Sequence, residues 1–313
     1  MNQMYKAMNI SKQSFHQYHN RLIRRMEQEA YLTNIITQVR ADHPTMGCRD
    51  MYYFINPEGM GRDVFESFCR DSGLLVKRVK NYRRTTDSSG VKRFDNLTLD
   101  LQVNKPNQLW VSDITYYQVG DRFYYLTFIM DKYSRRIIGH KTSTRLLTTH
   151  STLPALQMAL KTRKGQDITG VILHSDGGGQ YYADRFLKLT KDSRIKNSMC
   201  IYPWENPYAE RINGVIKNNY LVHRNIKSLE DLEKEVDRAV KLYNQEKPHI
   251  SLQRLSPINF ESTIFVNGKR NGDEESTEKM KTYSPEGCKP SGLMVKETET
   301  SDVTKKINVK LNL

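Results

Sequence analysis

Three acidic residues occupy positions where a carboxylate needs a partner. Asp113 lies inside 109–117 (LWVSDITYY), a run of β-forming residues that is apolar on both faces, as in a strand buried on both sides. A charge in such a place costs several kcal/mol unless something pairs with it. Asp176 directly follows the apolar run 170–173, and Glu210 falls in the first turn of a predicted helix. We therefore predict that the three carboxylates converge on one site.

Carboxylates from two strands and a crossing helix predict a site for divalent cations. Mg²⁺ or Mn²⁺ prefers oxygen ligands, and two such ions about 4 Å apart promote in-line displacement at phosphorus. Each acid also has an ordinary interpretation. Asp176 precedes the glycines 177–179, which let a backbone turn sharply, so it could be a turn residue. Glu210 could be a solvated helix residue, whereas Asp113 is the hardest to explain without a ligand.

The composition favours a polyanionic partner. The chain has 313 residues, with 49 Lys and Arg against 35 Asp and Glu, a net charge of +14. Nucleic acid is the first expectation, and a basic protein without such a partner is the alternative. The four cysteines lie far apart without a CxxC pair, which excludes a zinc knuckle or disulfide frame and fits a reducing cytoplasm. Because no signal peptide or membrane-length apolar run occurs, we expect a soluble, cytoplasmic, nucleoid-associated protein without a membrane partner.

The first 76 residues are predicted to form a helical region that binds DNA. Ser11 can cap a short helix within residues 1–20, which follows a shorter one at 4–8. This layout resembles half of a helix-turn-helix, although a plain helix pair is the alternative. Three further helices are expected at 20–41, at 49–56, and at 62–72 with Val64, Phe65 and Phe68 on one face.

Two polar segments separate and follow the predicted domains. Residues 77–98 form a basic linker, and its part 77–93 contains seven basic residues and one acid. We predict that this linker lies on DNA phosphates, with a solvated linker as the alternative. Residues 266–313 are expected to be a mostly disordered tail. Its last run, KINVKLNL, alternates like a strand that could add to a sheet edge.

The segment 99–265 has the pattern of one α/β domain. Its predicted order of elements, β-β-β-α-β-α-β-α-α, is that of a ribonuclease-H-like mixed sheet flanked by helices. In this arrangement Asp121 and Asp131 are expected to be turn residues, and His174 a packed strand-end histidine. The expected strands are 109–117, 122–130, 135–141, 170–173 and 198–202, and the expected helices are 148–160, 183–189, 207–220 and 228–243.

Five segments, in order, carry a resemblance to a known family. They are WVSDITY, YYLTFIMDKYSRRIIGH, HSDGGGQY, NPYAERINGVIK and YNQEKPHISLQRLSP. Together they resemble the catalytic half of insertion-sequence transposases of the retroviral-integrase (DDE) superfamily, the type usually made from a second reading frame. The resemblance implies that Asp113, Asp176 and Glu210 form the catalytic, metal-binding triad. It also places the family's lysine on Lys217, two helical turns after Glu210, as a DNA phosphate contact, with Asn213 between them as a further DNA contact.

The sequence departs from the family pattern in two places. Only 33 residues separate Asp176 from Glu210, fewer than is common in the family, and the shortening falls near Trp204. Glu205 is therefore a rival for the third carboxylate, although it lacks the NPYAE frame. Asn219 stands where many relatives have another acid. Trp204 flanks the acids and could stack on DNA.

The resemblance implies a DDE transposase, which cleaves DNA strands at transposon ends and transfers them into target DNA. It would use Mg²⁺ or Mn²⁺, with two ions, and act as a homo-oligomer on paired double-stranded DNA ends. Fusion with, or binding to, an upstream-frame partner is also expected. One alternative is a catalytically inactive or domesticated DNA-binding protein, against which the intact triad argues. A second is a ribonuclease H or other nuclease, against which the basic N-terminal region and the Glu210–Lys217 helix argue.

Overall fold

The computed structural model describes Tyr5 and residues 10–76, 93–200 and 202–270. The chain divides into two compact units, Met1–Lys269 and Arg270–Leu313, and the account below concerns the first. The predicted first short helix apart from Tyr5, residues 77–92 of the basic linker and the predicted terminal strand lie outside the described residues.

The N-terminal helices differ from the predicted layout at one point. Helix α2 runs without a break over Lys12–Asp42, and Ser11 caps it by accepting the backbone N–H of Ser14 at 3.0 Å. The helix expected after Ser11 and the helix expected from residue 20 are therefore one continuous helix and not two. The stretch around Asn20 contains neither proline nor glycine, the two residues that most destabilise a helix interior, so the helix continues through it.

Helices α3 (Cys48–Ile55) and α4 (Arg62–Asp71) pack with the second half of α2 around a small apolar core. Val64 was expected to lie on the buried face of α4, but its side chain is 60% exposed. The buried positions are Phe65, Phe68 and Cys69, which share one helical stripe, whereas Val64 is turned by about 100° from Phe65.

The described sheet has five strands in the order β3-β2-β1-β4-β5. Strands β1, β2 and β3 are antiparallel, and β4 and β5 run parallel to β1. The predicted Gly120–Asp121 turn joins β1 to β2, with Gly120 at a φ of +57°. This topology confirms the predicted ribonuclease-H-like mixed sheet. The strands are β1 Leu109–Val119, β2 Arg122–Asp131, β3 Ile137–Ser143, β4 Ile172–Ser175 and β5 Lys196–Met199.

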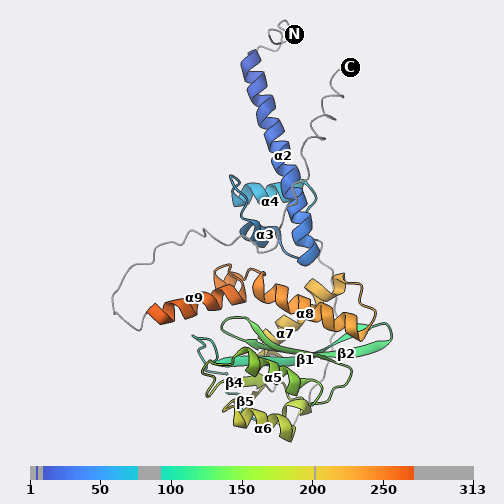
Figure 1. Cartoon of the computed structure of the whole chain (residues 1–313), viewed down its shortest axis with the longest axis vertical. Coiled ribbons are helices and arrows are strands. Elements are labelled where there is room, and N and C mark those ends of the chain that lie inside the picture. The colour runs from blue at the N-terminus through green and yellow to red at the C-terminus, as the bar shows by residue number, and fades with distance from the viewer. Residues whose placement is uncertain (1–4, 6–9, 77–92, 201, 271–313) are drawn as a thin grey trace. The chain divides into compact units, whose positions relative to one another are not determined.

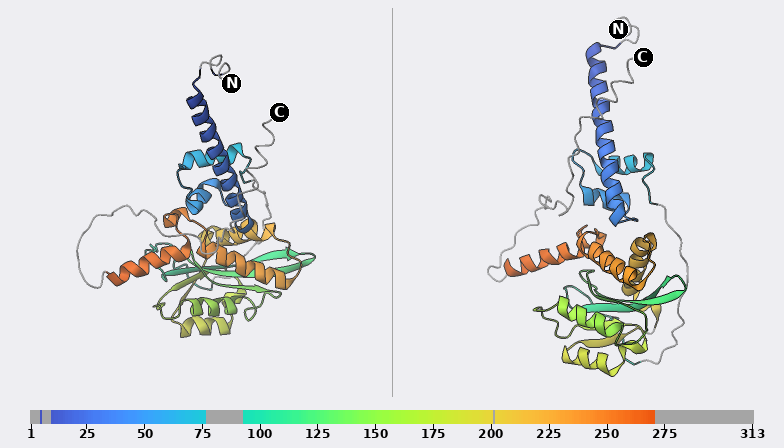
Figure 2. Two further views of the ribbon diagram at one scale, coloured as in Figure 1. Left: turned by 45° about the horizontal axis from the view of Figure 1, so that its top comes forward. Right: turned by 45° about the vertical axis from the view of Figure 1, so that its right-hand side comes forward.

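Helices cover both faces of this sheet (Figures 1 and 2). Helices α7 (Pro207–Val215) and α8 (Leu229–Gln245) share one apolar core with the sheet, and α5 (Thr152–Thr162) and α6 (Asp184–Asp192) share the other. Burial on both faces explains why the start of β1 is apolar without alternation. Trp110 belongs to the core on the α5 side and is fully buried.

A last helix, α9 (Pro257–Arg270), was not predicted and continues into the segment expected to be a tail. Its Glu261 is buried and pairs with Arg163 at the end of α5, which also pairs with Asp131 at 3.2 Å. Asp131 does accept the turn N–H groups of Tyr133 and Ser134, as a turn residue should. Its interpretation as only a turn residue is wrong, because it is fully buried in an ion network.

Candidate active site

The sheet register sets two of the predicted carboxylates at one level. Val111 on β1 lies opposite His174 on the parallel strand β4. Two residues further along each strand stand Asp113 and Asp176, so the two aspartates are neighbours where β4 ends. Leu109 and Val111 contact the core on the α7 side, and Asp113 shares their face because side chains alternate along a strand.

Asp113 is held from two directions. Asn213 Nδ2 on α7 donates to Asp113 Oδ2 at 2.7 Å, and the backbone N–H of Ile114 donates to its Oδ1 at 2.9 Å. Burial raises the pKa of Asp113 to about 7, and the negative charges of Asp176 and Glu210 add to the increase. The carboxylates therefore crowd one another, and a cation bound among them would relieve the repulsion.

Asp176 stands just beyond β4 and is partly buried, which raises its pKa. The backbone N–H of Gly178 donates to Asp176 Oδ1 at 3.1 Å. The glycines were expected to provide a sharp turn, but none of residues 177–179 has a positive φ. The structure gives another reason for a small residue at Gly178, because a Cβ there would lie 2.9 Å from Gln180 Oε1 and 3.0 Å from Asp176 Oδ1, so these side chains would have to move.

Two hydrogen bonds join β1 to α7 and to the π-helical turn Ile216–Tyr220 that directly follows it. Asn213 on α7 contacts Asp113, and Lys217 Nζ in the π-helical turn donates to Thr115 Oγ1 at 2.7 Å. Four helical residues rise by about 6 Å and two strand residues by about 6.6 Å, so the spacings match. Burial lowers the pKa of Lys217, while nearby Asp113 favours its charged form. These two contacts hold the end of α7 and the turn that follows it against β1.

The start of α7 is anchored by a residue that the sequence analysis did not single out. Asn206 is buried, and its side-chain amide donates to the backbone oxygen of Ser112 at 3.0 Å, next to Asp113. Its place directly before Pro207 at the helix start was the available signal. The rival Glu205 lies in the preceding 3₁₀ turn, where its Oε2 accepts the backbone N–H of Tyr202 at 3.1 Å.

In the structure the three predicted carboxylates do not lie close enough together to form a complete set of metal ligands. Among the residues that the structure describes, no three His, Cys, Asp or Glu side chains lie close enough together to hold a metal ion. Asp113 and Asp176 are partly buried and adjacent, whereas Glu210 is exposed on the first turn of α7. The donors are all carboxylate oxygens in a crowded negative environment, which fits Mg²⁺ or Mn²⁺.

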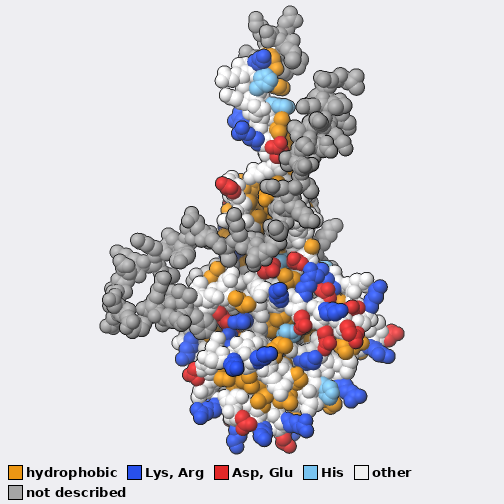
Figure 3. All heavy atoms as spheres, viewed as in Figure 1, with side chains coloured by type: hydrophobic (Ala, Val, Ile, Leu, Met, Phe, Trp, Pro, Cys, Tyr) orange, Lys and Arg blue, Asp and Glu red, His pale blue; other side chains and the backbone are white. Residues whose placement is uncertain are grey.

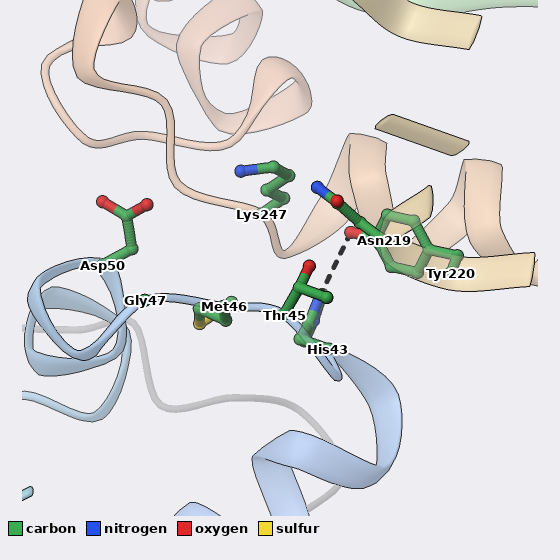
Figure 4. Close-up of a pocket in the computed structure, with 8 residues that line it drawn as sticks. All are labelled: His43, Thr45, Met46, Gly47, Asp50, Asn219, Tyr220 and Lys247. Carbon is green, nitrogen blue, oxygen red and sulfur yellow. Dashed lines mark hydrogen bonds between the residues drawn. The ribbon is translucent and has the colours of Figure 1, made fainter. Parts of the chain in front are cut away.

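A small pocket elsewhere shows where Asn219 lies (Figure 4). In that pocket His43 hydrogen-bonds Tyr220 at 3.2 Å, and its other ring nitrogen lies 3.1 Å from Glu246. Asn219 lines this pocket and not the group of Asp113 and Asp176. The family departure at this position therefore falls outside the candidate site. The eight lining residues are His43, Thr45, Met46, Gly47, Asp50, Asn219, Tyr220 and Lys247.

Comparisons with known proteins agree with this architecture. Two models of the integrase core domain match residues 103–202 and 191–257. The chain is 32% identical over 200 residues to transposase InsF for insertion sequence IS3A of Escherichia coli K12, covering 62% of this chain and 68% of the relative. It is 27% identical over 248 residues to the transposase for insertion sequence element IS629 of Shigella sonnei, covering 77% and 82%.

Among solved structures, the HTLV-2 integrase catalytic core domain in complex with magnesium matches with a TM-score of 0.40 at 21% identity. This match covers 50% of the present chain and 96% of the integrase core. Within the described ranges, every helix is too short or too polar to cross a membrane.

Proposed function

Because this chain belongs to the insertion-sequence transposases with an integrase-like catalytic core, we propose that it cleaves DNA strands at the ends of a mobile element and transfers them into target DNA. The observation that carries this proposal is the pair Asp113 and Asp176 at one level of the sheet, with Glu210 on the adjoining turn of α7. Carboxylates so arranged serve a reaction at phosphorus better than one at carbon, because divalent ions neutralise phosphate charge.

Asp113, Asp176 and Glu210 would hold two Mg²⁺ or Mn²⁺ ions. When bound, the ions would supply charge neutralisation at the phosphate and make oxygen nucleophiles more reactive. Asn213 fixes one oxygen of Asp113, so it acts as a positioning residue for that carboxylate. The predicted contact of Asn213 with DNA stays a prediction, since its amide faces Asp113 and the residue is buried.

The reaction proceeds in two displacements at phosphorus. A water oxygen first attacks the phosphodiester at the transposon end, the bond to the 3′ oxygen breaks, and a free 3′-hydroxyl and a 5′-phosphate result. That hydroxyl then attacks a phosphodiester of the target strand, forms the new bond and releases the target's own 3′-hydroxyl. Each step exchanges one P–O bond for another, so no covalent link between protein and DNA is needed.

Lys217 supports this reaction from the π-helical turn that follows α7. Its ammonium group lies by Thr115, close enough to Asp113 for the carboxylate to favour its charged form. In that place it can hold a DNA phosphate beside the carboxylates. We expect the protein to act as a homo-oligomer on paired DNA ends, alone or with an upstream-frame partner. The catalytically inactive DNA-binding protein remains the alternative, and the intact set of carboxylates and their contacts speaks against it.

The test is nicking of supercoiled plasmid carrying the element's ends, with Mg²⁺ or Mn²⁺ and with EDTA. We expect metal-dependent nicking by the wild type, loss of it in Asp113→Asn and Glu210→Gln, and its retention in Glu205→Gln. Loss in Glu205→Gln instead of Glu210→Gln would reassign the third carboxylate. A wild-type protein that binds this DNA but nicks it with neither metal would favour the inactive alternative.

A further inference from the structure

Two exposed aromatic side chains form a flat pair just before α7. The rings of Tyr202 and Trp204 lie 4.5 Å apart between their centroids and are inclined by only 4°. Trp204 is 71% exposed and Tyr202 is 51% exposed. A stacked pair of large rings left in water is unusual, because burying one such side chain is worth several kcal/mol at an interface. The exposed ring faces can accept another flat group.

The pair is fastened to the candidate active site on both sides. Before it, the backbone N–H of Cys200 donates to the oxygen of Ser175, the neighbour of Asp176, at 2.9 Å. After it, Asn206 donates to the oxygen of Ser112, the neighbour of Asp113. The backbone N–H of Tyr202 is itself bound by Glu205. The aromatic pair therefore stands at the edge of the group of carboxylates.

We propose that Trp204, backed by Tyr202, stacks on an unpaired DNA base next to the phosphodiester that reacts. This inference rests on the proposed function, because it takes the substrate beside Asp113 and Asp176 to be DNA. Every base has a flat π face, and stacking on an aromatic side chain does not require a particular sequence. Tyr202 holds the indole ring in one plane, so less freedom is lost when a base joins the stack.

Charge favours a nucleic acid over an apolar partner at this place. The chain carries a net charge of +14. Close to Asp176, the Arg93 guanidinium lies 5.8 Å from the ring centre of Tyr182, whose hydroxyl donates to the Asp176 backbone oxygen at 3.2 Å. A strand whose phosphate lies at the carboxylates would thus have positive charge near the backbone and an aromatic surface for its base. Separating one base from its neighbours also opens the duplex where the reaction occurs.

The chain is suited to a direct test because Trp204 is one of its two tryptophans, and the second, Trp110, is fully buried. Quenching of tryptophan emission on adding DNA therefore reports mainly on Trp204. The full chain in EDTA is titrated with a short duplex containing one unpaired thymine and with the same duplex carrying an abasic site there. We expect quenching several-fold larger for the thymine, and affinity for it about tenfold weaker in Trp204→Ala.

Matched variants separate stacking from general effects. Trp204→Phe keeps an aromatic face and should recover most of the affinity. Phe123→Ala removes another exposed aromatic, on β2, and should leave binding unchanged. Equal quenching by the thymine and abasic duplexes, or full affinity in Trp204→Ala, would overturn the inference. A change in oligomeric state with Trp204→Ala, together with unaltered DNA binding, would also overturn it and assign the pair to a protein contact.

The outcomes for the two proposals can be told apart. Selective quenching by the unpaired thymine without any nicking would support the stacking site and contradict the proposed transposase chemistry. Metal-dependent nicking, together with equal quenching by the thymine and abasic duplexes, would support the transposase chemistry and contradict the stacking site. Because the stacking measurement is made without metal, a failure of catalysis cannot imitate its loss.

Discussion

At the scale of single residues, the candidate site holds negative charge that the fold alone does not neutralise. The pKa of Asp113 is raised to about 7, mainly by burial and also by the negative charges of Asp176 and Glu210. Among the described residues, its hydrogen bonds come from two neutral groups, the Asn213 amide and the backbone N–H of Ile114. We therefore expect the protein in EDTA to be less stable than a variant with a neutral side chain at this position. If Asp113 binds a metal ion as proposed, function and stability oppose each other here.

Replacement of Asp113 should show this opposition directly. In the unfolded chain an aspartate has a pKa of about 3.9, so the unfolded state loses its proton first as pH rises. Stability should then fall from about pH 4 until pH passes the folded pKa of about 7, by up to ~4 kcal/mol. We expect Asp113→Asn to be more stable than the wild type in EDTA at pH 8 and nearly equal to it at pH 4.

Urea unfolding in EDTA at both pH values measures that difference. Asp121→Asn, at the exposed Gly120–Asp121 turn, serves as the control and should not change the pH dependence. An Asp113→Asn protein that is less stable than the wild type at pH 8 would show that the carboxylate is already paired in the metal-free fold.

Asn213 should set how tightly the site holds its ions. Removing a side chain that orients a metal ligand typically costs 10–100-fold in metal affinity. We expect Asn213→Ala to need about 10–100-fold more Mg²⁺ for half-maximal nicking, with a smaller change in the rate at saturating metal. Asn218→Ala, an exposed neighbour on the same helical segment, is the control. An unchanged Mg²⁺ requirement in a folded Asn213→Ala protein would contradict this role.

At the scale of elements, α9 is held to the sheet domain by charge. Arg163 bridges Asp131 and Glu261, and all three side chains are nearly or fully buried. Arg136 adds a contact to Glu261 at 2.7 Å. A buried pair of this kind is expensive to break, since each remaining charge is left without its partner. The network thus ties the end of β2, the end of α5 and α9 into one unit.

Arg163→Met should therefore destabilise the fold by about 3–5 kcal/mol, because it leaves the buried Asp131 without a cationic partner and Glu261 with Arg136 alone. Urea unfolding at neutral pH measures the loss. Lys161→Met is the matched control, since Lys161 is exposed two residues earlier on α5, and it should change stability by less than about 0.5 kcal/mol. A loss under about 1 kcal/mol in Arg163→Met would mean that the ion network contributes little.

The elements also show what the sequence could predict. The position of Asp113 in a strand apolar on both faces, and of Asp176 just beyond another strand, was readable because both signals are local. The hydrogen bond between Asn213 and Asp113 could not be predicted, since helical spacing predicts the face on which a side chain lies but not its partner. Asp131 was predicted to be a turn residue, and it does accept the backbone N–H groups of the turn that follows it. Its partner Arg163 lies 32 residues later and also pairs with Glu261, which stands on a helix that was not predicted.

At the scale of the whole molecule, the net charge of +14 is the property that most affects DNA binding. On the face shown in Figure 3, Lys and Arg side chains are interspersed with Asp and Glu over the sheet domain. That face therefore does not show a single continuous basic track. Binding should depend on many separate phosphate contacts, with the site residues adding a few that are well defined.

Salt dependence tests this view. If the chain contacts six to ten phosphates, affinity for duplex DNA should fall roughly 10³–10⁵-fold between about 50 and 200 mM salt. Lys217→Gln should lower the slope of log affinity against log salt by about one, because it removes one phosphate contact. Trp204→Ala should weaken binding without changing that slope, since stacking releases no counterions. Titrations by fluorescence anisotropy of labelled DNA measure all three, and a slope near zero for the wild type would show that the net charge does not act through phosphates.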